Sequence, residues 1–476
     1  MPNIASLIPA DQPWVEQFRG GETAAEARCV LLWVQRAKRA TANPAANLAV
    51  TLADRLRLPV VAVFCLVPGY PSATHRTYQF MAEGLRDLPD AFAARGIGWT
   101  LRIGDPVTIL PALARELGAA VVVTDQDPLR LGREWRSGVA EALSVPLVAI
   151  DTDTVAPPAL FPKEEWAART IRPKLWRAIA AHDLLAPILD PVASHRDELS
   201  SWRDGPDPLD AIERMPLDRA VTPSPAVPGG RAEALTRLDQ FVRHRLATYH
   251  EDRDQADRDG QSGLGPYLHF GQIGPVEVAR AILAAKEAGG GDARPDSFLD
   301  ELLVQRELSV NFALRNPRYD QYGGLPDWGR KTLAEHAADA RPARYSRQQL
   351  EAGETADRLW NAAQRQMVDE GTMPNRLRMY WAKQILLWTA SPEEAYETTI
   401  SMNDRYFLCG RDAAGYANVA WAIGGRHDRP FPPNKPVLGL VRPLGRKGMD
   451  RKFDTVAYIA KVEARLGVAI PPPPTA

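Results

Sequence analysis

The chain has 476 residues, of which 45% are hydrophobic and 25% charged, as expected for a globular protein of two or three domains. Lys and Arg total 58 against 59 Asp and Glu, which excludes a uniformly basic nucleic-acid binder but not a local basic face. The three cysteines are too few and too far apart for a disulfide framework or a zinc site. We find neither a membrane-spanning apolar run nor a signal peptide, so we expect a cytoplasmic protein.

The first half of the chain alternates short apolar runs with amphipathic stretches. The runs, most of them rich in β-branched residues, predict buried strands at 29–34, 59–67, 98–103, 119–124 and 145–150. The stretches between them predict helices at 45–56, 77–94 and 106–117. This alternation predicts a doubly wound parallel sheet, forming an α/β domain over residues 24–155. Asp125 and Asp151 follow two strands, where ligands often bind, although aspartates are also ordinary helix caps there.

The second half is predicted to be helical. Residues 156–230 are rich in Pro and Gly and predict a connector, with a helical piece near 163–180. Beyond position 230, apolar residues recur at intervals of three and four, which predicts an all-α domain over residues 231–476. Its predicted helices include 275–287, 297–314, 356–369, 373–389 and 392–402.

Several common site motifs are missing from the sequence. There is no GxxxxGK[ST] phosphate loop, no GxSxG turn and no GxGxxG after the first strand. The histidines form no HxxxH or HxH pair and the cysteines no CxxC pair, so we expect no metal site. Any nucleotide-like group must therefore be held without the usual fingerprints.

The segment Ser262–Gly274 is a candidate anion-binding loop. Small residues with free backbone N–H groups precede Pro266 and an apolar helix, an arrangement that can wrap a phosphate group. An ordinary Gly-Pro turn is the alternative interpretation.

Tryptophan, normally the rarest aromatic residue, is as frequent as Tyr and Phe, with 12 of each. Trp381 and Trp388 are two helical turns apart and share one face, and Trp360 lies on the preceding predicted helix. Three tryptophans on neighbouring helices can simply pack in a core. Because indole is oxidisable, they could alternatively form a path for electrons.

Two further features carry charge. Residues 426–452 contain eight basic and two acidic residues among Gly and Pro, which favours a phosphate-contacting surface over a merely solvated loop. Glu301 lies within an apolar predicted helix and shares a face with Gln305. A buried carboxylate needs either a partner, such as Arg306, or a function.

Seven short strings together resemble the class II cyclobutane pyrimidine dimer photolyases. They occur in the family's order between about residues 28 and 460, at 170–174, 262–271, 306–312, 359–362, 378–383, 410–416 and 451–454. The resemblance implies an N-terminal α/β domain, a long linker and a C-terminal helical domain that holds FAD in a folded conformation. It also implies light-driven repair, in which reduced FADH⁻ donates an electron to the dimer and recovers it after the ring splits.

The implied partner is UV-damaged DNA that contains cyclobutane pyrimidine dimers. The lesion must leave the duplex to approach the flavin, as is general for photolyases. No membrane or protein partner is implied, and we expect a monomer. Whether a second, antenna chromophore binds near residues 35–44 is left open.

The resemblance assigns roles to individual residues. The cofactor-binding set is Tyr249, Arg253, Ser262, Gly263, Leu264, Gly265, Arg378, Asn403, Arg411 and Asp412. The catalytic set is Glu301, Met379 and Asn403, in which Asn403 faces flavin N5 and Glu301 hydrogen-bonds the dimer as a neutral, buried acid. The electron path is Trp388, Trp360 and Trp381, with Trp381 nearest the flavin. The DNA-binding set is Trp421, Arg429, Arg442, Arg446 and Lys447.

The chain departs from the family at several of these positions. Cys409 stands where relatives often have Asp, so Arg378 is expected to find another partner, with Asp412 the candidate. Relatives often have Asn at Asp254 and Ser at Gly265. Some place an aromatic residue where this chain has Gln305, which leaves that stacking contact in doubt.

Two other functions compete with repair. A cryptochrome-type blue-light photoreceptor would have the same fold without the reaction, but Glu301, Met379, Trp421 and the basic tail favour repair. The third hypothesis is a nucleotide-binding α/β protein whose helical domain is structural and binds no flavin.

Overall fold

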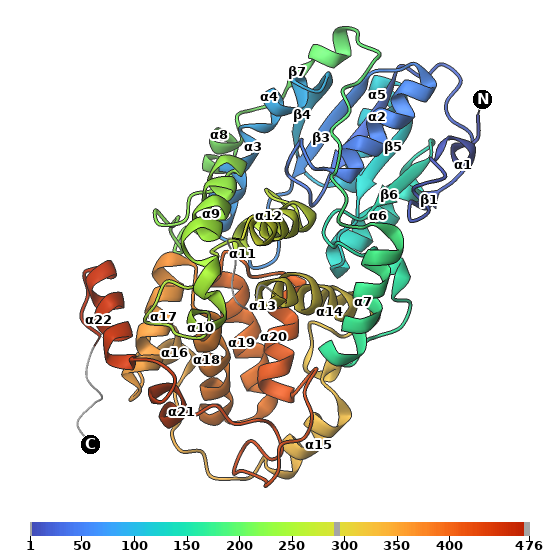
Figure 1. Ribbon diagram of the computed structural model, residues 1–476. Helices are drawn as coiled ribbons and strands as arrows, with labels where there is room; N and C mark the ends of the chain where they lie inside the picture. Colours follow the sequence, from blue (N-terminus) through green and yellow to red (C-terminus); the bar gives the residue numbers. More distant parts are fainter. Residues whose placement is uncertain (1, 290–295, 471–476) are drawn as a thin grey trace.

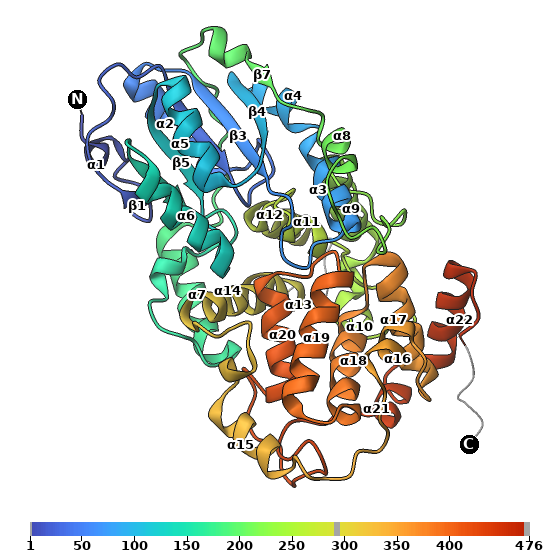
Figure 2. The same cartoon turned by 180° about the vertical axis from the view of Figure 1, so that it is seen from behind.

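The computed structural model describes residues 2–289 and 296–470 (Figure 1). A sheet domain built from the first half of the chain lies against a helical domain built from the second, and the view from behind shows the same division (Figure 2). Within the described residues, no helix is long and apolar enough to cross a membrane.

The sheet has seven strands in the order β1-β6-β5-β2-β3-β4-β7. All neighbours are parallel except β1 and β6; in the centre, Val30 pairs with Val60. The strands are β1 (Glu16–Arg19), β2 (Cys29–Val34), β3 (Val60–Leu66), β4 (Ile97–Ile103), β5 (Ala119–Asp125), β6 (Leu147–Ile150) and β7 (Arg203–Asp204). Five of these strands match the predicted apolar runs, because both faces of a central parallel strand are buried.

Alternate residues of each central strand enter two separate cores. Val30 and Leu32 pack under α2 and α4, whereas Leu31 and Trp33 pack under α5 and α6. The helices of this domain are α1 (Ile4–Leu7), α2 (Pro44–Leu56), α3 (His75–Leu85), α4 (Leu88–Ala93), α5 (Pro106–Leu117) and α6 (Arg130–Ala142). The predicted doubly wound α/β domain is confirmed.

Four details of this half differ from the prediction. The single predicted helix 77–94 is two helices, because the chain breaks near Asp87 before Pro89. Helix α6 was not predicted. The short edge strands β1 and β7 were not predicted either, since four and two residues are too few to establish a period. Strand β7 belongs to the connector and pairs with β4, so the sheet extends beyond residues 24–155.

The connector and the second half are helical apart from β7. Their α-helices are α7 (Ala168–His182), α8 (Pro208–Glu213), α9 (Arg231–His244), α10 (Tyr249–Asp252), α11 (Gly265–His269), α12 (Pro275–Glu287), α13 (Asp296–Leu299), α14 (Arg306–Arg315), α15 (Asp327–Glu335), α16 (Arg347–Ala352), α17 (Arg358–Glu370), α18 (Asn375–Trp388), α19 (Pro392–Tyr406), α20 (Ala413–Gly424), α21 (Arg446–Asp450) and α22 (Thr455–Leu466). Short 3₁₀ turns lie at Pro158–Leu160, Glu198–Ser201, Leu246–Thr248 and Tyr322–Gly324.

The predicted helix 297–314 is interrupted by a π-helix over Asp300–Gln305. Glu301 and Gln305 therefore lie in a widened turn rather than on one face of a regular α-helix. Such π segments are rare and often occur at functional sites.

Buried charges join the two domains. Arg36, from the loop after β2, lies 3.0 Å from Asp153 and 3.4 Å from Asp412 at the start of α20. Arg76, on α3, donates to the carbonyl oxygens of Met367 and Tyr406 in the helical domain, at 3.1 and 3.0 Å. These contacts fix the sheet domain against α17, α19 and α20.

Candidate functional site

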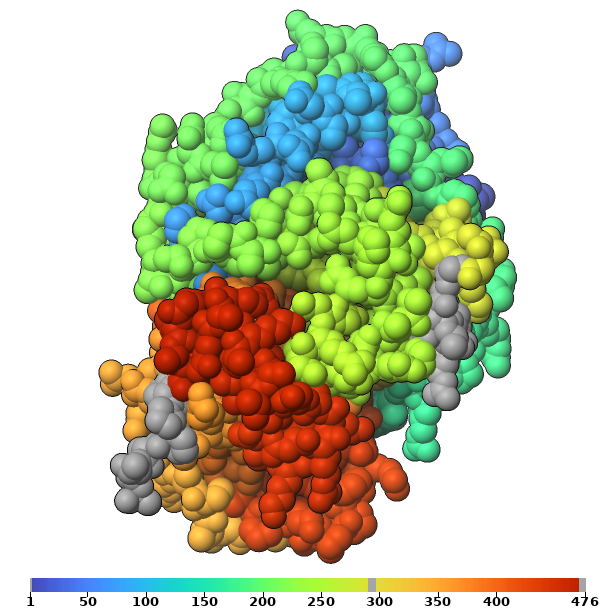
Figure 3. Space-filling view, turned by 60° about the vertical axis from the view of Figure 1, so that its left-hand side comes forward, coloured from blue at the N-terminus to red at the C-terminus, as the bar shows by residue number. Residues whose placement is uncertain are grey.

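A cleft with two connected parts opens in the helical domain. The first part, of about 400 Å³, lies between the segment 245–265 and α22, which are neighbours on one face of the molecule (yellow-green and dark red in Figure 3). The second part, of about 500 Å³, lies against the π-helix, α18 and α20. Both parts are lined by Tyr249, Arg253, Ser262, Gly265, Glu301 and Asn375.

The first part is suited to an anionic ligand. Its lining contains seven basic residues (Arg237, Arg245, Arg253, Arg258, Arg378, Lys461 and Arg465) against three acidic ones (Asp254, Asp259 and Glu301). The candidate phosphate loop forms one wall: a Cβ at Gly265 would meet no atom within 4 Å, and Gly263 has a φ of +71° that favours glycine. Open space beside small residues and excess positive charge fit the diphosphate of a dinucleotide.

Most of the predicted cofactor residues line this first part. Tyr249, Arg253, Ser262, Gly263, Gly265 and Arg378 do so, together with Phe407 and Cys409. Leu264 is different, because its side chain is buried in the core among α9, α11 and α12.

Arg378 does not pair with Asp412, contrary to the prediction. Its guanidinium stacks over the Phe407 ring at 3.9 Å, donates to the Sγ atom of Cys409 at 3.3 Å and donates to Oδ1 of Asn403. Asp412 caps α20 by accepting from the N–H of Ala413, which turns its carboxylate toward Arg36.

Asn403 is fully buried behind Arg378. Its Nδ2 atom donates to Oδ1 of Asp404 at 2.8 Å, and a Cβ at Gly415 would lie 3.2 Å from that nitrogen. The amide is thus held between a cation and a carboxylate, next to the first part of the cleft.

The predicted lesion-contacting residues come together in the second part of the cleft. Glu301, Met379 and Trp421 all line it, as do Gln305 and Asp412. Elements as distant in sequence as the π-helix, α18 and α20 therefore contribute to one surface.

Glu301 is neither fully buried nor without a charged partner. Its Oε1 atom accepts from Nη2 of Arg253 at 2.6 Å, and 32% of its side chain is exposed. The sequence had suggested a buried neutral acid, with Arg306 as the alternative partner. Arg306 instead binds Asp153 at 2.5 Å and so belongs to the charges that join the domains.

The three predicted electron-path tryptophans are in contact. Trp381 and Trp360 stack with ring centroids 6.4 Å apart and planes 9° apart, and Trp388 meets Trp360 edge-on at 5.4 Å. Trp360 thus lies between the other two rings. Phe407 lines the cleft and contacts Trp381 at 6.3 Å, which puts Trp381 at the cleft end of the row.

The basic tail is divided between paired and exposed residues. Arg442 makes a two-point ion pair with Asp428 at 2.7 and 2.8 Å, and Arg446 pairs with Asp450 and Asp357. Arg426 is buried and bound to Glu164. The exposed residues are Arg429, Lys435, Lys447, Arg451 and Lys452. Only five of the eight basic side chains in residues 426–452 are exposed, so the basic surface is narrower than the prediction for this segment.

Lys383, on α18, is a buried cation to which the sequence had assigned no role. Its Nζ atom has no hydrogen-bond partner and lies 5.1 Å from the ring centre of Trp421. Burial lowers the pKa of Lys383 to about 7, against a smaller opposing effect of Asp428. The local pattern gives no signal for it, because a Lys within a helix is normally exposed.

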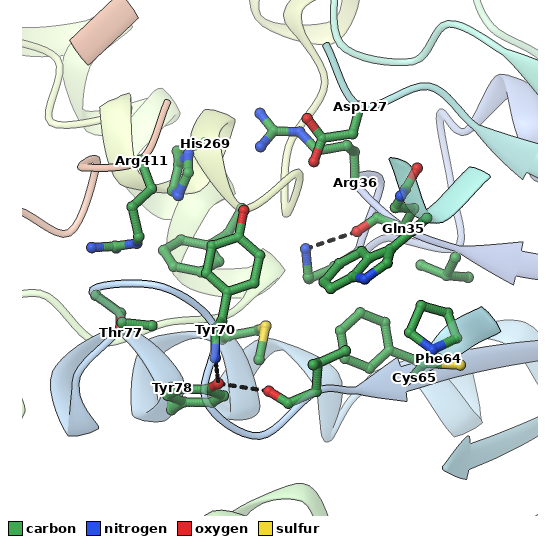
Figure 4. Close-up of a pocket in the computed structure, with 18 of the residues that line it drawn as sticks. Gln35, Arg36, Phe64, Cys65, Tyr70, Thr77, Tyr78, Asp127, His269 and Arg411 are labelled. Carbon is green, nitrogen blue, oxygen red and sulfur yellow. Dashed lines mark hydrogen bonds between the residues drawn. The ribbon is translucent and has the colours of Figure 1, made fainter. Parts of the chain in front are cut away.

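A separate, smaller pocket of about 110 Å³ lies at the carboxyl ends of the strands and is referred to as the N-terminal pocket. Figure 4 shows Tyr70 pointing into it, with His269 and Arg411 on one side and Arg36 and Asp127 on the other. Arg411 was predicted to contact the cofactor in the helical domain, and its side chain lies here instead. The backbone of Arg411 is in the left-handed region, with a φ of +55°.

The loop 35–38 forms one wall of the N-terminal pocket. Asp125 holds it by accepting from the N–H groups of Gln35, Arg36 and Ala37 at 2.5 to 2.7 Å. Asp125 therefore positions a loop rather than capping a helix. Lys38 lies 5.5 and 5.9 Å from the rings of Phe64 and Phe270.

The fold is that of a class of two-domain proteins, the photolyases and cryptochromes. The class III photolyase of Agrobacterium tumefaciens superposes with a TM-score of 0.68 over 94% of this chain and 88% of that one, at 20% identity. The cryptochrome of Synechocystis sp. PCC6803 superposes with a TM-score of 0.69 over 94% of this chain and 96% of that one, at 16% identity. At these identities the likeness concerns the fold alone.

Sequence comparison gives the family. The DNA photolyase family profile matches residues 30–193. The deoxyribodipyrimidine photo-lyase of Methanothermobacter thermautotrophicus is 35% identical, covering 94% of this chain and 97% of its own. That of Potorous tridactylus is 38% identical, covering 92% of this chain and 82% of its own. The chain belongs to the DNA photolyase family, whose members bind FAD, and the resemblance seen in its motifs is confirmed.

Proposed function

We propose that the protein is a deoxyribodipyrimidine photo-lyase that repairs cyclobutane pyrimidine dimers in DNA by light-driven electron transfer. The observation that carries the proposal is one connected cleft, in which a basic wall with small residues continues into a surface with Glu301, Met379 and Trp421. Similarity to proteins named deoxyribodipyrimidine photo-lyase over more than nine-tenths of the chain supports the same activity.

FAD is proposed to occupy the first part of the cleft. Its diphosphate would lie against Ser262, Gly263 and Gly265, and Arg378 would lie beside its ring system. We assign Asn403 to flavin N5, because it stands directly behind Arg378 and its amide can hydrogen-bond an N–H group. Bound in its reduced form, FADH⁻, the cofactor would supply the light-excited electron that splits the cyclobutane ring.

The flipped dimer is proposed to occupy the second part of the cleft. Met379 and Trp421 would be apolar walls, and Glu301 would hydrogen-bond the pyrimidine. The ion pair with Arg253 bears on this role, because it orients the Glu301 carboxylate before the lesion arrives. Asp412 lines the same part of the cleft. Its role there would be indirect, because it binds Arg36 and caps the start of α20.

The row of tryptophans is proposed to carry electrons inward. Trp388, the least buried of the three, would take up an electron and pass it through Trp360 to Trp381, which keeps the cofactor reduced. Support comes from the continuous ring contacts and from the Trp381 N–H group, which donates to buried Gln364 at 2.8 Å and fixes the ring.

DNA backbone contacts are proposed for Arg429, Arg442, Arg446 and Lys447. Arg429 and Lys447 are exposed and could neutralise phosphates at once. Arg442 and Arg446 are held by carboxylates, so a phosphate would have to share or replace those partners.

Blue-light incubation with an oligonucleotide that contains one cyclobutane dimer is the direct test. We expect restoration of intact pyrimidines only in the light, with a (6–4) lesion left unrepaired. Binding of flavin without any repair of either lesion would favour the alternative, a cryptochrome-type photoreceptor. An absorption spectrum without flavin bands would exclude both.

Binding of a second chromophore in the N-terminal pocket is a separate proposal. The N-terminal pocket combines aromatic walls, Tyr70, Trp135 and Phe64, with the buried amine of Lys38, whose pKa burial lowers to about 8. Planar light-absorbing groups suit such walls. The Sulfolobus tokodaii photolyase, similar in fold (TM-score 0.69, 16% identity), is described with two FAD molecules. Extraction of the purified protein, followed by chromatography, would show whether any pigment besides FAD is released.

A further inference from the structure

Trp166 is an unusual side chain in this molecule. It lies in the connector two residues before α7, and 64% of it is exposed. Among residues 2–289 and 296–470, it is the only exposed Phe, Tyr or Trp. A large aromatic side chain in water forgoes the stabilisation that burial would give, so its exposure calls for an explanation.

The indole of Trp166 packs against a buried arginine, Arg426. The guanidinium of Arg426 lies 5.2 Å from the centre of its ring and 4.7 Å from that of Phe312. Arg426 is itself buried and ion-paired with Glu164, and the N–H of Glu165 donates to Asn311 at 2.7 Å. Both residues before Trp166 are thus fixed to the helical domain, and the indole is presented on a rigid support.

This support stands at the mouth of the second part of the cleft. Ala168, two residues after Trp166, and His427, next to Arg426, both line that part together with Glu301 and Trp421. The indole is therefore close to the entrance through which the flipped dimer would pass.

The surroundings of Trp166 favour a polyanion. Residues 163–177 contain five basic and two acidic residues. Both acids are occupied: Glu164 by Arg426 and Glu165 by Lys174 at 2.5 Å. Lys163, Arg169 and Arg177 are exposed on the same stretch. An aromatic ring among exposed cations is the combination by which proteins bind unstacked nucleic acid.

We propose that Trp166 stacks against a base or sugar flanking the lesion when damaged DNA is bound, and so extends the DNA interface onto the connector. This inference rests on the proposed repair function. A dimer that leaves the duplex exposes the faces of its neighbours, and an indole can cover one of them. The chain has Gln305 in the second part of the cleft, so the rigid indole at its mouth adds a stacking surface that the glutamine does not provide.

The test is the affinity for an oligonucleotide with one dimer, measured for wild type, Trp166→Ala, Trp166→Phe and Leu189→Ala. Trp166→Ala should weaken binding about tenfold, Trp166→Phe less, because one base–aromatic stack is lost or reduced. Leu189 is 77% exposed and also in the connector, so its replacement controls for loss of exposed apolar surface and should change nothing. Repair of bound DNA should continue at the wild-type rate when Trp166→Ala is saturated with substrate.

Unchanged affinity of a folded Trp166→Ala variant would overturn the inference, and thermal melting establishes that it is folded. Repair by the wild-type enzyme distinguishes failure of the stacking role from failure of the proposed function. If wild type repairs dimers and Trp166→Ala binds as tightly, only the stacking role is wrong. If wild type repairs nothing, the proposed function fails whatever the variants do. Equal loss of affinity for undamaged duplex would also contradict the inference, since no base is unstacked there.

Discussion

The cleft and the N-terminal pocket differ in how exposed and how firmly held their polar side chains are. The pocket lies at strand ends, and its polar groups are buried and fixed, as when Asp125 accepts three backbone N–H groups. The cleft is lined by long side chains from helices and loops, many of them partly exposed and paired with one another, as Arg253 is with Glu301.

This difference predicts which residues should affect folding stability and which should affect binding or chemistry. A buried charge near the pocket is desolvated and depends on its partners, so its loss should cost folding free energy. A partly exposed ion pair in the cleft contributes little to folding, so its loss should alter binding or chemistry. The following predictions test this division, beginning with the largest effect.

Trp381→Phe should abolish light-driven reduction of the oxidised cofactor, because it interrupts the row of rings at its cleft end. Repair by chemically pre-reduced enzyme should remain. Time-resolved absorption under blue light measures the first, and dimer repair the second. Trp135→Phe, which changes an indole of the N-terminal pocket, is the matched control and should photoreduce normally. Continued photoreduction in Trp381→Phe would remove the row from the mechanism.

Arg36→Met should lower the free energy of unfolding by about 3 kcal/mol, because breaking one side of a buried ion pair leaves Asp153 and Asp412 short of a partner. Chemical denaturation followed by circular dichroism measures this. Arg429→Ala, at an exposed position of the tail, should change it by less than about 0.5 kcal/mol. Similar losses in both variants would contradict the division drawn above.

Lys383→Met should stabilise the protein, and the gain should depend on pH. The folded-state pKa of about 7 lies below the ordinary value of 10.5, so between these values the unfolded chain binds a proton that the folded one does not. The penalty in wild type is therefore full at and below pH 7 and disappears toward pH 10.5. On the order of 5 kcal/mol is expected at pH 6, and less than about 1 kcal/mol at pH 10.

Melting temperatures of wild type and Lys383→Met across this pH range measure the effect. Lys383→Arg is the control, because it keeps the positive charge and should give no gain. A stabilisation of Lys383→Met that does not vary with pH would show that the amine is not desolvated as the geometry implies.

Glu301→Ala should reduce the repair yield about tenfold while FAD stays bound, because one charge-assisted hydrogen bond to the lesion is lost. Repair of dimer-containing DNA at saturation measures the yield, and the flavin spectrum measures cofactor retention. The variant should unfold at nearly the wild-type temperature, since Glu301 is partly exposed. An unchanged yield would remove Glu301 from the reaction.

Arg429→Ala and Arg442→Ala should have the smallest effects: each should weaken DNA binding by about threefold or less, with a shallower dependence on salt. Because Arg442 is already engaged with Asp428, its replacement should cost less affinity than that of Arg429. Titrations at several salt concentrations test both. Equal affinity and equal slope in Arg429→Ala would exclude the tail from the interface.

Much of the fold could be predicted because its signals are local. A central parallel strand is apolar throughout, and helices such as α12 and α18 begin near proline and carry apolar residues at helical intervals. The break near Asp87 and the π-helix at Asp300–Gln305 could not be predicted, since both depend on how neighbouring elements pack.

The candidate site was predictable only as a set of residues. The string that contains Arg378 indicated its place near the cofactor, but its partners, Cys409 and Asn403, became known only from the structure. Gln364 and Phe407, which hold and cover Trp381, gave no signal of their own.

By itself, the sequence indicated the two-domain architecture, the family and many of the residues that line the cleft. The tertiary structure decided which charges pair, which remain exposed and where Arg411, Lys383 and Trp166 lie. The physical reason is range: hydrophobic periodicity is a property of adjacent residues, whereas ion pairing and exposure depend on groups brought together from distant parts of the chain.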